Sequence, residues 1–319
     1  MLELPATPSM ASRLLALLMM RSLRVLGGVV RPGTTPLRVV REAFDAIGRT
    51  PLPRGTKIKP VTPGGVPGLL VTAKEAQEST GILLYLHGGG FVCGSPRTHR
   101  QLAARISAST GLPIVLLDYR LAPEHPFPAA AEDALTAYRW LLSEGYQPSQ
   151  IVVGGDSAGG HLTACLLADI AGEKLPMPSA AILLSPFLDL TGAELASRDL
   201  ALRDPFVPPD YAVWCGLAYA GENLQSHRRL DVLKVRKRGW PPVLIQVGGT
   251  ECLLGDSERM AESLRRAGGY CDLQVWPGQV HVFHWFAPWL PEANAALRHI
   301  GEFVREVSTR VSTGSGMVS

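Results

Sequence analysis

The most informative stretch of this chain is Ile151-Val152-Val153-Gly154-Gly155-Asp156-Ser157-Ala158-Gly159. It predicts a buried strand that ends in a sharp turn, with Ser157 at the turn and a helix directly after it. Glycine stands two residues before and two residues after the serine, where a Cβ atom would collide with the strand or the helix. The free N–H groups and the dipole of such a helix point to where negative charge forms during acyl transfer. We therefore interpret Ser157 as a nucleophile.

A second glycine-rich turn lies upstream. The apolar run at residues 82–86 predicts another buried strand, and His87-Gly88-Gly89-Gly90-Phe91 follows it directly. Three consecutive glycines allow the main chain to approach a substrate oxygen and to donate backbone N–H groups to it. Gly-x-Ser-x-Gly alone also fits an ordinary turn in a chain with 33 glycines. A flexible loop after a strand does not predict a serine turn downstream, so the two motifs together favour a catalytic site.

The motifs resemble those of the hormone-sensitive-lipase family of α/β-hydrolase esterases, in the branch whose serine motif reads Gly-Asp-Ser-Ala-Gly. The resemblance runs from about residue 55 to about residue 308, and its four motifs lie at residues 87–91, 118–128, 155–160 and 277–281. It implies an α/β-hydrolase fold, with a central, mostly parallel eight-stranded sheet, helices on both faces and a helical cap. It also implies a serine, acid and histidine in that chain order.

Apolar runs that alternate with helical patterns predict the same architecture. The expected strands are residues 57–61, 69–72, 82–86, 114–118, 151–155, 181–184, 243–247 and 271–276. A hairpin turn is expected at residues 63–65, and a helix is expected to begin at Asp256 or Ser257 and to end at residues 268–269. Functional residues are then expected on loops at the carboxyl ends of the strands.

The resemblance suggests one catalytic domain interrupted by cap segments. We expect N-terminal cap helices in residues 1–48, the catalytic domain in residues 49–187 and 231–310, a second cap segment in residues 188–230, and a flexible tail in residues 311–319.

His281 is the predicted base, because it follows a strand by a short turn, as the family's histidine does. His284 and His299 lie further into the following helical stretch and are interpreted as structural. The predicted acid is Glu251, where the commonest family pattern has the aspartate of Asp-Pro-Leu; glutamate serves this role elsewhere in the fold. Asp256, five residues later, is interpreted as a helix N-cap.

The predicted oxyanion hole consists of the N–H groups of Gly88, Gly89 and Ala158. Asp156 is expected to support the serine turn through hydrogen bonds. Residues 118–124 are expected to support the first glycine-rich loop. A predicted apolar pocket over the serine limits the substrate to short or medium acyl chains. Its expected lining residues are Phe91, Phe206, Tyr211 and Trp214.

Bulk composition restricts the partners. A net charge of +3 with 18% charged residues, and no basic stripe interleaved with aromatics, argues against nucleic acid. Five cysteines form neither a CxxC pair nor a zinc spacing with histidine, so no metal is expected, and no organic cofactor is implied. Their odd number suggests reduced thiols and a cytoplasmic location. A homodimer is left open.

The N-terminal apolar run is interrupted by Arg13, Arg21 and Arg24, so it is too short to span a membrane. Leucines interspersed with arginines suggest an amphipathic helix. We interpret it as part of the cap, with peripheral membrane contact as the alternative.

The resulting expectation is a serine carboxylesterase that acts on small ester substrates through an acyl-enzyme. Two other functions stay open. One is a non-catalytic ligand receptor on an esterase fold, against which the presence of His281 argues. The other is a thioesterase, amidase or acyltransferase with the same three residues.

Overall fold

The computed structural model describes residues 4–27, 37–48, 50–202, 204–221, 227, 229–287 and 289–313. Six of the nine residues of the predicted tail therefore lie outside the described residues, and residues 311–313 belong to the last helix.

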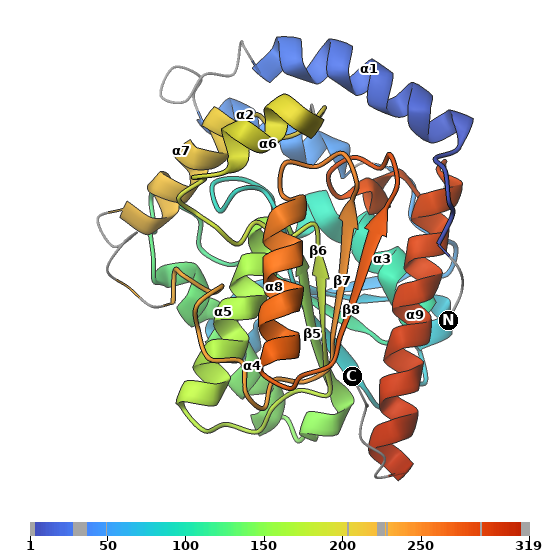
Figure 1. Ribbon diagram of the computed structural model, residues 1–319. Coiled ribbons are helices and arrows are strands. Elements are labelled where there is room, and N and C mark those ends of the chain that lie inside the picture. Colours follow the sequence, from blue (N-terminus) through green and yellow to red (C-terminus); the bar gives the residue numbers. More distant parts are fainter. Residues whose placement is uncertain are drawn as a thin grey trace.

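One eight-stranded sheet forms the centre of the molecule, in the order β1-β2-β4-β3-β5-β6-β7-β8 (Figure 1). Its strands are β1 (Lys57–Val61), β2 (Gly68–Thr72), β3 (Ile82–Leu86), β4 (Ile114–Leu117), β5 (Ile151–Asp156), β6 (Ala180–Leu184), β7 (Val243–Gly248) and β8 (Cys271–Trp276). Strand β2 pairs antiparallel with β1 and with β4, and strands β3 to β8 are parallel to one another. The predicted strands and the mostly parallel sheet are confirmed. The expected hairpin turn is a short 3-10 helix, η1 (Pro63–Gly65).

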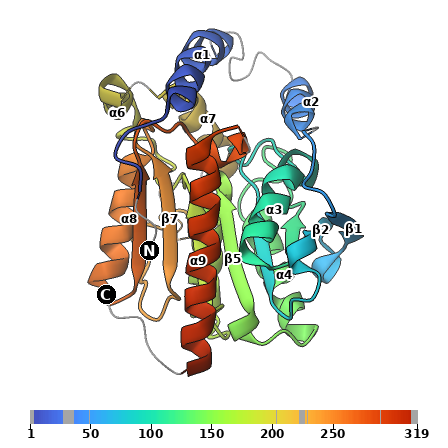
Figure 2. The ribbon, with the colours of Figure 1, turned by 90° about the vertical axis from the view of Figure 1, so that its right-hand side faces the viewer.

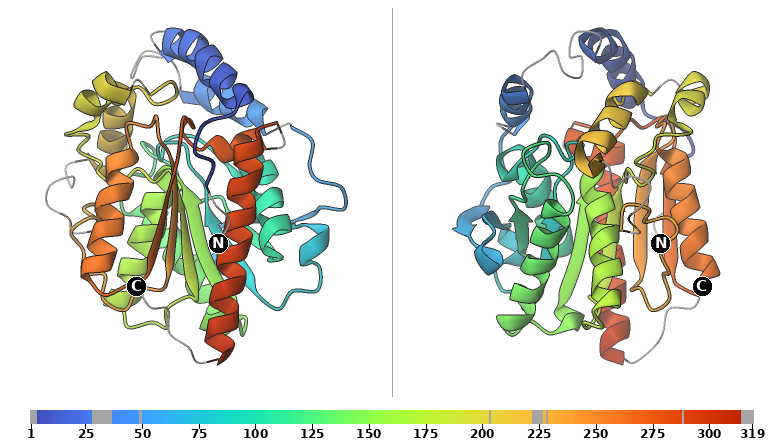
Figure 3. Two further views of the ribbon diagram at one scale, coloured as in Figure 1. Left: turned by 45° about the vertical axis from the view of Figure 1, so that its right-hand side comes forward. Right: turned by 90° about the vertical axis from the view of Figure 1, so that its left-hand side faces the viewer.

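Helices cover both faces of the sheet (Figure 3). One layer consists of α3 (Pro96–Thr110) and α9 (Pro291–Thr313), and the other of α4 (Ala129–Ser143), α5 (Ala158–Gly172) and α8 (Leu254–Arg266). Strand residues alternate between the two layers, so that Leu83 and Tyr85 pack with the first and Leu84 and Leu86 with the second. Two apolar cores therefore enclose the parallel strands, which explains their continuous hydrophobic sequences.

A local signal explains where α3 begins, but not where α8 begins. The side chain of Ser95 caps α3 by accepting from the N–H groups of Arg97 and Thr98. Helix α8 begins at Leu254, with Leu253 at the N-cap, so the prediction that Asp256 caps this helix is wrong. The Asp256 carboxylate instead accepts from the N–H groups of Leu188 and Asp189, a long-range contact that the sequence does not signal.

Four further helices lie beyond the carboxyl ends of the parallel strands (Figure 2). They are α1 (Met10–Gly27), α2 (Leu37–Ile47), α6 (Leu195–Leu202) and α7 (Pro209–Ala220). Within the described ranges, no helix is both long enough and apolar enough to cross a bilayer. The proposed cap segments thus lie over the edge of the sheet where functional loops are expected.

Candidate active site

Ser157 lies at the junction of β5 and α5 with φ 53° and ψ −118°. Few non-glycine residues adopt a positive φ, and a strained position of this kind is held by its surroundings. The flanking glycines make the turn sterically feasible. A Cβ atom on Gly155 would lie 2.4 Å from the carbonyl oxygen of Leu86, and one on Gly159 would lie 1.9 Å from it. The turn therefore lies directly against β3, and the space at both glycines is too small for a side chain.

Three predicted residues meet at this turn. Nε2 of His281 lies 3.0 Å from Oγ of Ser157, and Nδ1 of His281 lies 2.6 Å from Oε2 of Glu251. They follow three parallel strands, β5, β7 and β8, whose carboxyl ends share one edge of the sheet. The histidine and the glutamate are buried, whereas the serine is partly exposed. This geometry can remove a proton from the serine hydroxyl.

Two donors hold the other oxygen of Glu251. The Gly248 N–H donates to Oε1 at 2.5 Å, and the Ser185 hydroxyl donates to it at 2.7 Å. Ser185 also accepts from the N–H of Val282, next to the histidine. Sequence reasoning missed Ser185, although its position directly after β6 is a usable signal. The carboxylate is thus oriented by bonds on both oxygens.

The charges around His281 shift the pKa of its imidazole. Burial lowers the pKa of this imidazole, but Glu251, Asp204 and Asp156 together outweigh burial, so the pKa is raised above its usual value. Asp204 is a buried residue between α6 and α7 that accepts from the N–H of Cys252 at 3.0 Å. Burial, followed by the charge of Glu251, raises the pKa of Asp204.

The predicted oxyanion hole needs one correction. The Gly88 N–H points to Asp156, whose Oδ1 accepts it at 3.2 Å, so the structure contradicts its role as an oxyanion donor. The hydrogen bonds of the described chain include none donated by the N–H groups of Gly89, Gly90 or Ala158. Gly90, which was not predicted, therefore joins Gly89 and Ala158 as a candidate donor.

Buried polar contacts support both loops. Asp156 also accepts from the Tyr85 hydroxyl at 2.9 Å and lies 3.2 Å from Nε2 of His99. Burial alone would raise its pKa, but these partners outweigh burial and lower it. The Tyr119 hydroxyl donates to the carbonyl of His87 at 2.7 Å. Asp156 and the segment after β4 therefore lie where support for the two loops was expected.

The predicted pocket residues lie in different environments. The Phe206 ring is 5.6 Å from that of His281, so it lies over the candidate site. Phe91 has no accessible surface and stacks on Tyr219 of α7 at 4.0 Å, which contradicts its predicted role in lining a pocket. Tyr211 and Trp214 are half-buried on α7, with ring centroids 5.7 Å apart, and their pocket role stays a prediction.

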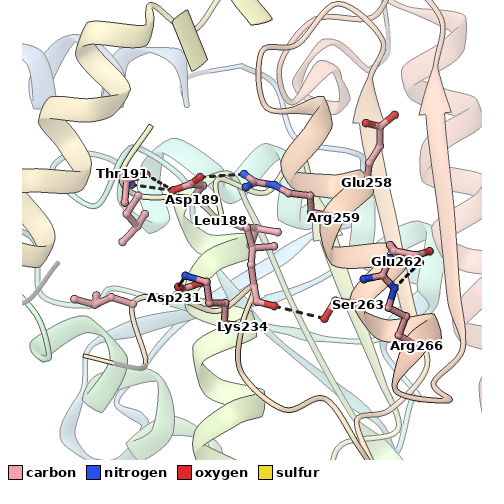
Figure 4. Close-up of a pocket in the computed structure, with 13 residues that line it drawn as sticks. Leu188, Asp189, Thr191, Asp231, Lys234, Glu258, Arg259, Glu262, Ser263 and Arg266 are labelled. Carbon is pink, nitrogen blue, oxygen red and sulfur yellow. Dashed lines mark hydrogen bonds and ion pairs between the residues drawn. The ribbon is translucent and has the colours of Figure 1, made fainter. Parts of the chain in front are cut away.

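A separate surface pocket of about 700 Å³ lies beside α8 (Figure 4). Arg259 in its wall bonds to Asp189 and Asp256, and the lining includes neither the three site residues nor any predicted pocket residue. It borders the place where the chain leaves the sheet for α6. Most of the charged side chains in its lining already pair, as Lys234 does with Asp231 and Arg266 with Glu262.

The two other histidines considered in the sequence, His284 and His299, lie in the interior of the protein. His284 is buried, and its Nε2 lies 2.8 Å from the side-chain oxygen of Gln246. His299 is buried against the ring of Trp276. All five cysteines are free thiols. Within the described ranges, no group of three or more histidine, cysteine, aspartate or glutamate side chains could hold a metal ion.

Known proteins resemble this chain in sequence and in structure. Residues 83–285 match a family described as the alpha/beta hydrolase fold. The carboxylesterase/phospholipase LipF of Mycobacterium tuberculosis is 34% identical over 315 residues, covering 94% of this chain and 83% of that protein. The acetyl-hydrolase of Streptomyces hygroscopicus is 34% identical over 244 residues, covering 76% and 80%. The crystal structure of an esterase from the bacterial hormone-sensitive lipase family superposes with a TM-score of 0.86 at 36% identity, covering 94% and 99%.

Proposed function

Since the chain belongs to the hormone-sensitive-lipase family of α/β-hydrolases and is an ester hydrolase, we propose that it is a serine carboxylesterase acting through an acyl-enzyme. Its nucleophile is Ser157, its base is His281 and its acid is Glu251. The observation that carries the proposal is the unbroken chain of contacts from Oγ of the serine through the imidazole to the carboxylate. Small esters of short- to medium-chain acids are its substrates.

In the first half-reaction, Oγ of Ser157 attacks the ester carbonyl carbon while Nε2 of His281 takes the hydroxyl proton. N–H groups of Gly89, Gly90 and Ala158 donate to the oxyanion that forms. The bond to the alcohol then breaks, and the imidazolium returns its proton to the leaving oxygen. In the second half-reaction the same histidine deprotonates a water molecule, which attacks the acyl carbon. The bond between that carbon and Oγ of Ser157 then breaks, the imidazolium returns its proton to Oγ, and the acid is released.

Phe206 supports the proposed size of the acyl group. Its ring lies against His281, and Asp204 ties this part of the second cap segment to the backbone beside Glu251. An aromatic side chain fixed over the reacting groups restricts the space for a long chain. We therefore expect the enzyme to prefer esters of short or medium acids to emulsified triglycerides.

The receptor alternative is disfavoured by the same contacts, because a receptor has no need of a base within hydrogen-bond distance of Ser157. Thioesterase, amidase and acyltransferase activities use the same three residues. They differ in the leaving group or in the acceptor of the acyl group.

A substrate panel tests the proposal. We would compare nitrophenyl esters from acetate to palmitate with an amide and a thioester of one acyl group, using the wild type, Ser157→Ala and His281→Ala. We expect the wild type to turn over short- or medium-chain esters fastest, and both variants to lose this activity. Ester turnover that survives in Ser157→Ala would refute the mechanism. An emulsified long-chain triglyceride is assayed beside the panel, and a rate on it above that on the short esters, with activation at the oil interface, would refute the assigned substrate size.

One partner prediction gains a structural basis. Met10, Leu14, Leu17 and Leu18 of α1 are exposed by 79%, 57%, 43% and 54%. The helix contains three arginines and no acidic residue, and Arg13 is exposed beside these side chains. We propose that α1 rests on an anionic lipid surface. We expect the protein to float with anionic vesicles but not with neutral ones, and a Leu14→Ser/Leu18→Ser variant to lose this binding. Equal flotation of the variant and the wild type would contradict the proposal. The cytoplasmic location and the homodimer stay predictions.

A further inference from the structure

The loop that carries the candidate oxyanion donors has an unusual backbone. Gly89, Gly90 and Phe91 have φ values of 118°, 62° and 65°. Glycine adopts such angles freely, but a bulky aromatic residue does so at a cost on the order of 1–3 kcal/mol. A strained segment keeps its shape only when its surroundings hold it. The contacts behind this loop therefore decide where its N–H groups point.

Bonds within the loop hold only part of it. The N–H groups of Val92 and Cys93 donate to the carbonyl of Gly89 at 3.2 and 3.0 Å, and the N–H of Ala122 donates to the carbonyl of Phe91 at 3.0 Å. These bonds close the turn and join it to the segment after β4. The carbonyl groups of Val92 and Ala122 are not used in these bonds and can accept from donors outside the loop.

Arg41 of the cap helix α2 supplies both outside bonds. Its Nε donates to the carbonyl of Val92 at 2.8 Å, and its Nη2 donates to the carbonyl of Ala122 at 3.0 Å. Glu124 accepts from Nη1 and Nη2 at 2.8 and 2.7 Å, which fixes the plane of the guanidinium. A planar fork that bonds two carbonyl groups sets their separation, which a single ammonium group does not.

Helix α2 is anchored independently of this arginine. The carboxylate of Asp45 accepts from the hydroxyls of Ser95 and Thr98 at 2.5 and 2.6 Å. Arg100 of α3 donates to the carbonyl of Gly48 at 2.9 Å. Removing the guanidinium at position 41 should therefore release the loop from α2 without releasing α2 from the domain.

We propose that Arg41 is a positioning residue for acyl transfer, which fixes the oxyanion loop from the cap through the carbonyl groups of Val92 and Ala122. The inference rests on the proposed esterase function. Losing one oxyanion donor costs about 10²- to 10³-fold in kcat, and displacing a donor should cost less. We expect a loss on the order of 10- to 100-fold in kcat.

Arg38 provides a matched control. It lies on the same helix, its side chain is 87% exposed, and its bonded partner in the described chain is Glu42 one turn away. We would compare Arg41→Met and Arg38→Met, with Arg41→Lys as the conservative variant. Wild type and Ser157→Ala are measured first, so that failure of the esterase proposal is seen separately.

Arg41→Met should lower kcat with KM within about twofold, Arg38→Met should match the wild type, and Arg41→Lys should fall between them. The second readout is inhibition by a trifluoromethyl ketone, which forms an oxyanion with the serine, compared with the matching methyl ketone. In Arg41→Met the inhibition constant of the fluoroketone alone should rise, in proportion to the loss of kcat/KM, because only its adduct places an oxyanion among the loop N–H groups. A smaller amount of folded protein would change neither inhibition constant.

Equal kcat in Arg41→Met and Arg38→Met would overturn the proposal, and so would a rise in KM at unchanged kcat. If Arg41→Met does not fold, Glu124→Gln, which loosens the guanidinium without removing it, should weaken fluoroketone binding selectively. Unchanged selectivity in that variant would also overturn the proposal.

Discussion

Replacing Glu251 by glutamine tests the candidate acid, because the two side chains have the same shape. The carboxylate accepts three bonds, from Gly248 N–H and the Ser185 hydroxyl on one oxygen and from His281 on the other. A glutamine that keeps its oxygen on the first two donors turns its NH₂ group toward Nδ1. The imidazole must then carry its proton on Nε2, where it cannot accept one from Ser157.

The opposite orientation of the amide is disfavoured. It would place the NH₂ group against the N–H of Gly248, whose nitrogen lies 2.5 Å from the present oxygen, and a buried donor left unpaired costs about 1–3 kcal/mol. The wrong tautomer therefore predominates, and the variant also loses the charge that stabilises the imidazolium. For a triad acid this costs a factor on the order of 10⁴ in kcat. That factor corresponds to about 5.4 kcal/mol of transition-state free energy.

The assay is kcat for a nitrophenyl ester, with Ser157→Ala as the floor and Asp256→Asn as the matched control. Asp256 is also a buried carboxylate near the start of α8, but it bonds to Leu188, Asp189 and Arg259 instead of the histidine. Turnover that survives in Glu251→Gln and collapses in Asp256→Asn would refute the assignment of the acid.

Three further predictions concern pH, thiols and stability. The proposed base must be neutral to accept a proton, and the pKa of His281 is raised above its usual 6.5. We therefore expect kcat/KM to fall as the pH drops through a value above 6.5, and an acid limb at or below pH 6.5 would contradict this. Burial raises the pKa of Cys93 to about 12, so iodoacetamide at pH 8 should label it only after unfolding, and rapid labelling of the folded enzyme would count against that. Asp256→Asn should lower the free energy of unfolding by about 1–3 kcal/mol, since its amide cannot accept from Arg259, and denaturation at wild-type stability would argue otherwise.

Two sequence interpretations failed for the same reason. Gly88 belongs to a recognisable motif, but its N–H points to Asp156, 68 residues away. Asp256 precedes a helical pattern, which favours a cap, but its carboxylate bonds to the backbone 67 and 68 residues earlier. In both cases the local sequence pattern predicted one hydrogen-bond partner, and folding brought a different one close. Ser185 and Arg41 escaped notice because their partners are also distant in the chain.

What the sequence determined by itself was local and steric. No side chain fits at Gly155 or Gly159 when a strand turns sharply into a helix against β3, so those glycines mark the serine turn in any chain that makes it. Continuous apolar runs likewise require burial on both faces of a sheet. Only the tertiary structure decided which carboxylate reaches His281 and which N–H groups stay free, because those outcomes depend on the relative placement of strand ends. Hydrogen-bond partners far apart in the chain are selected by packing, whereas backbone sterics act between neighbours.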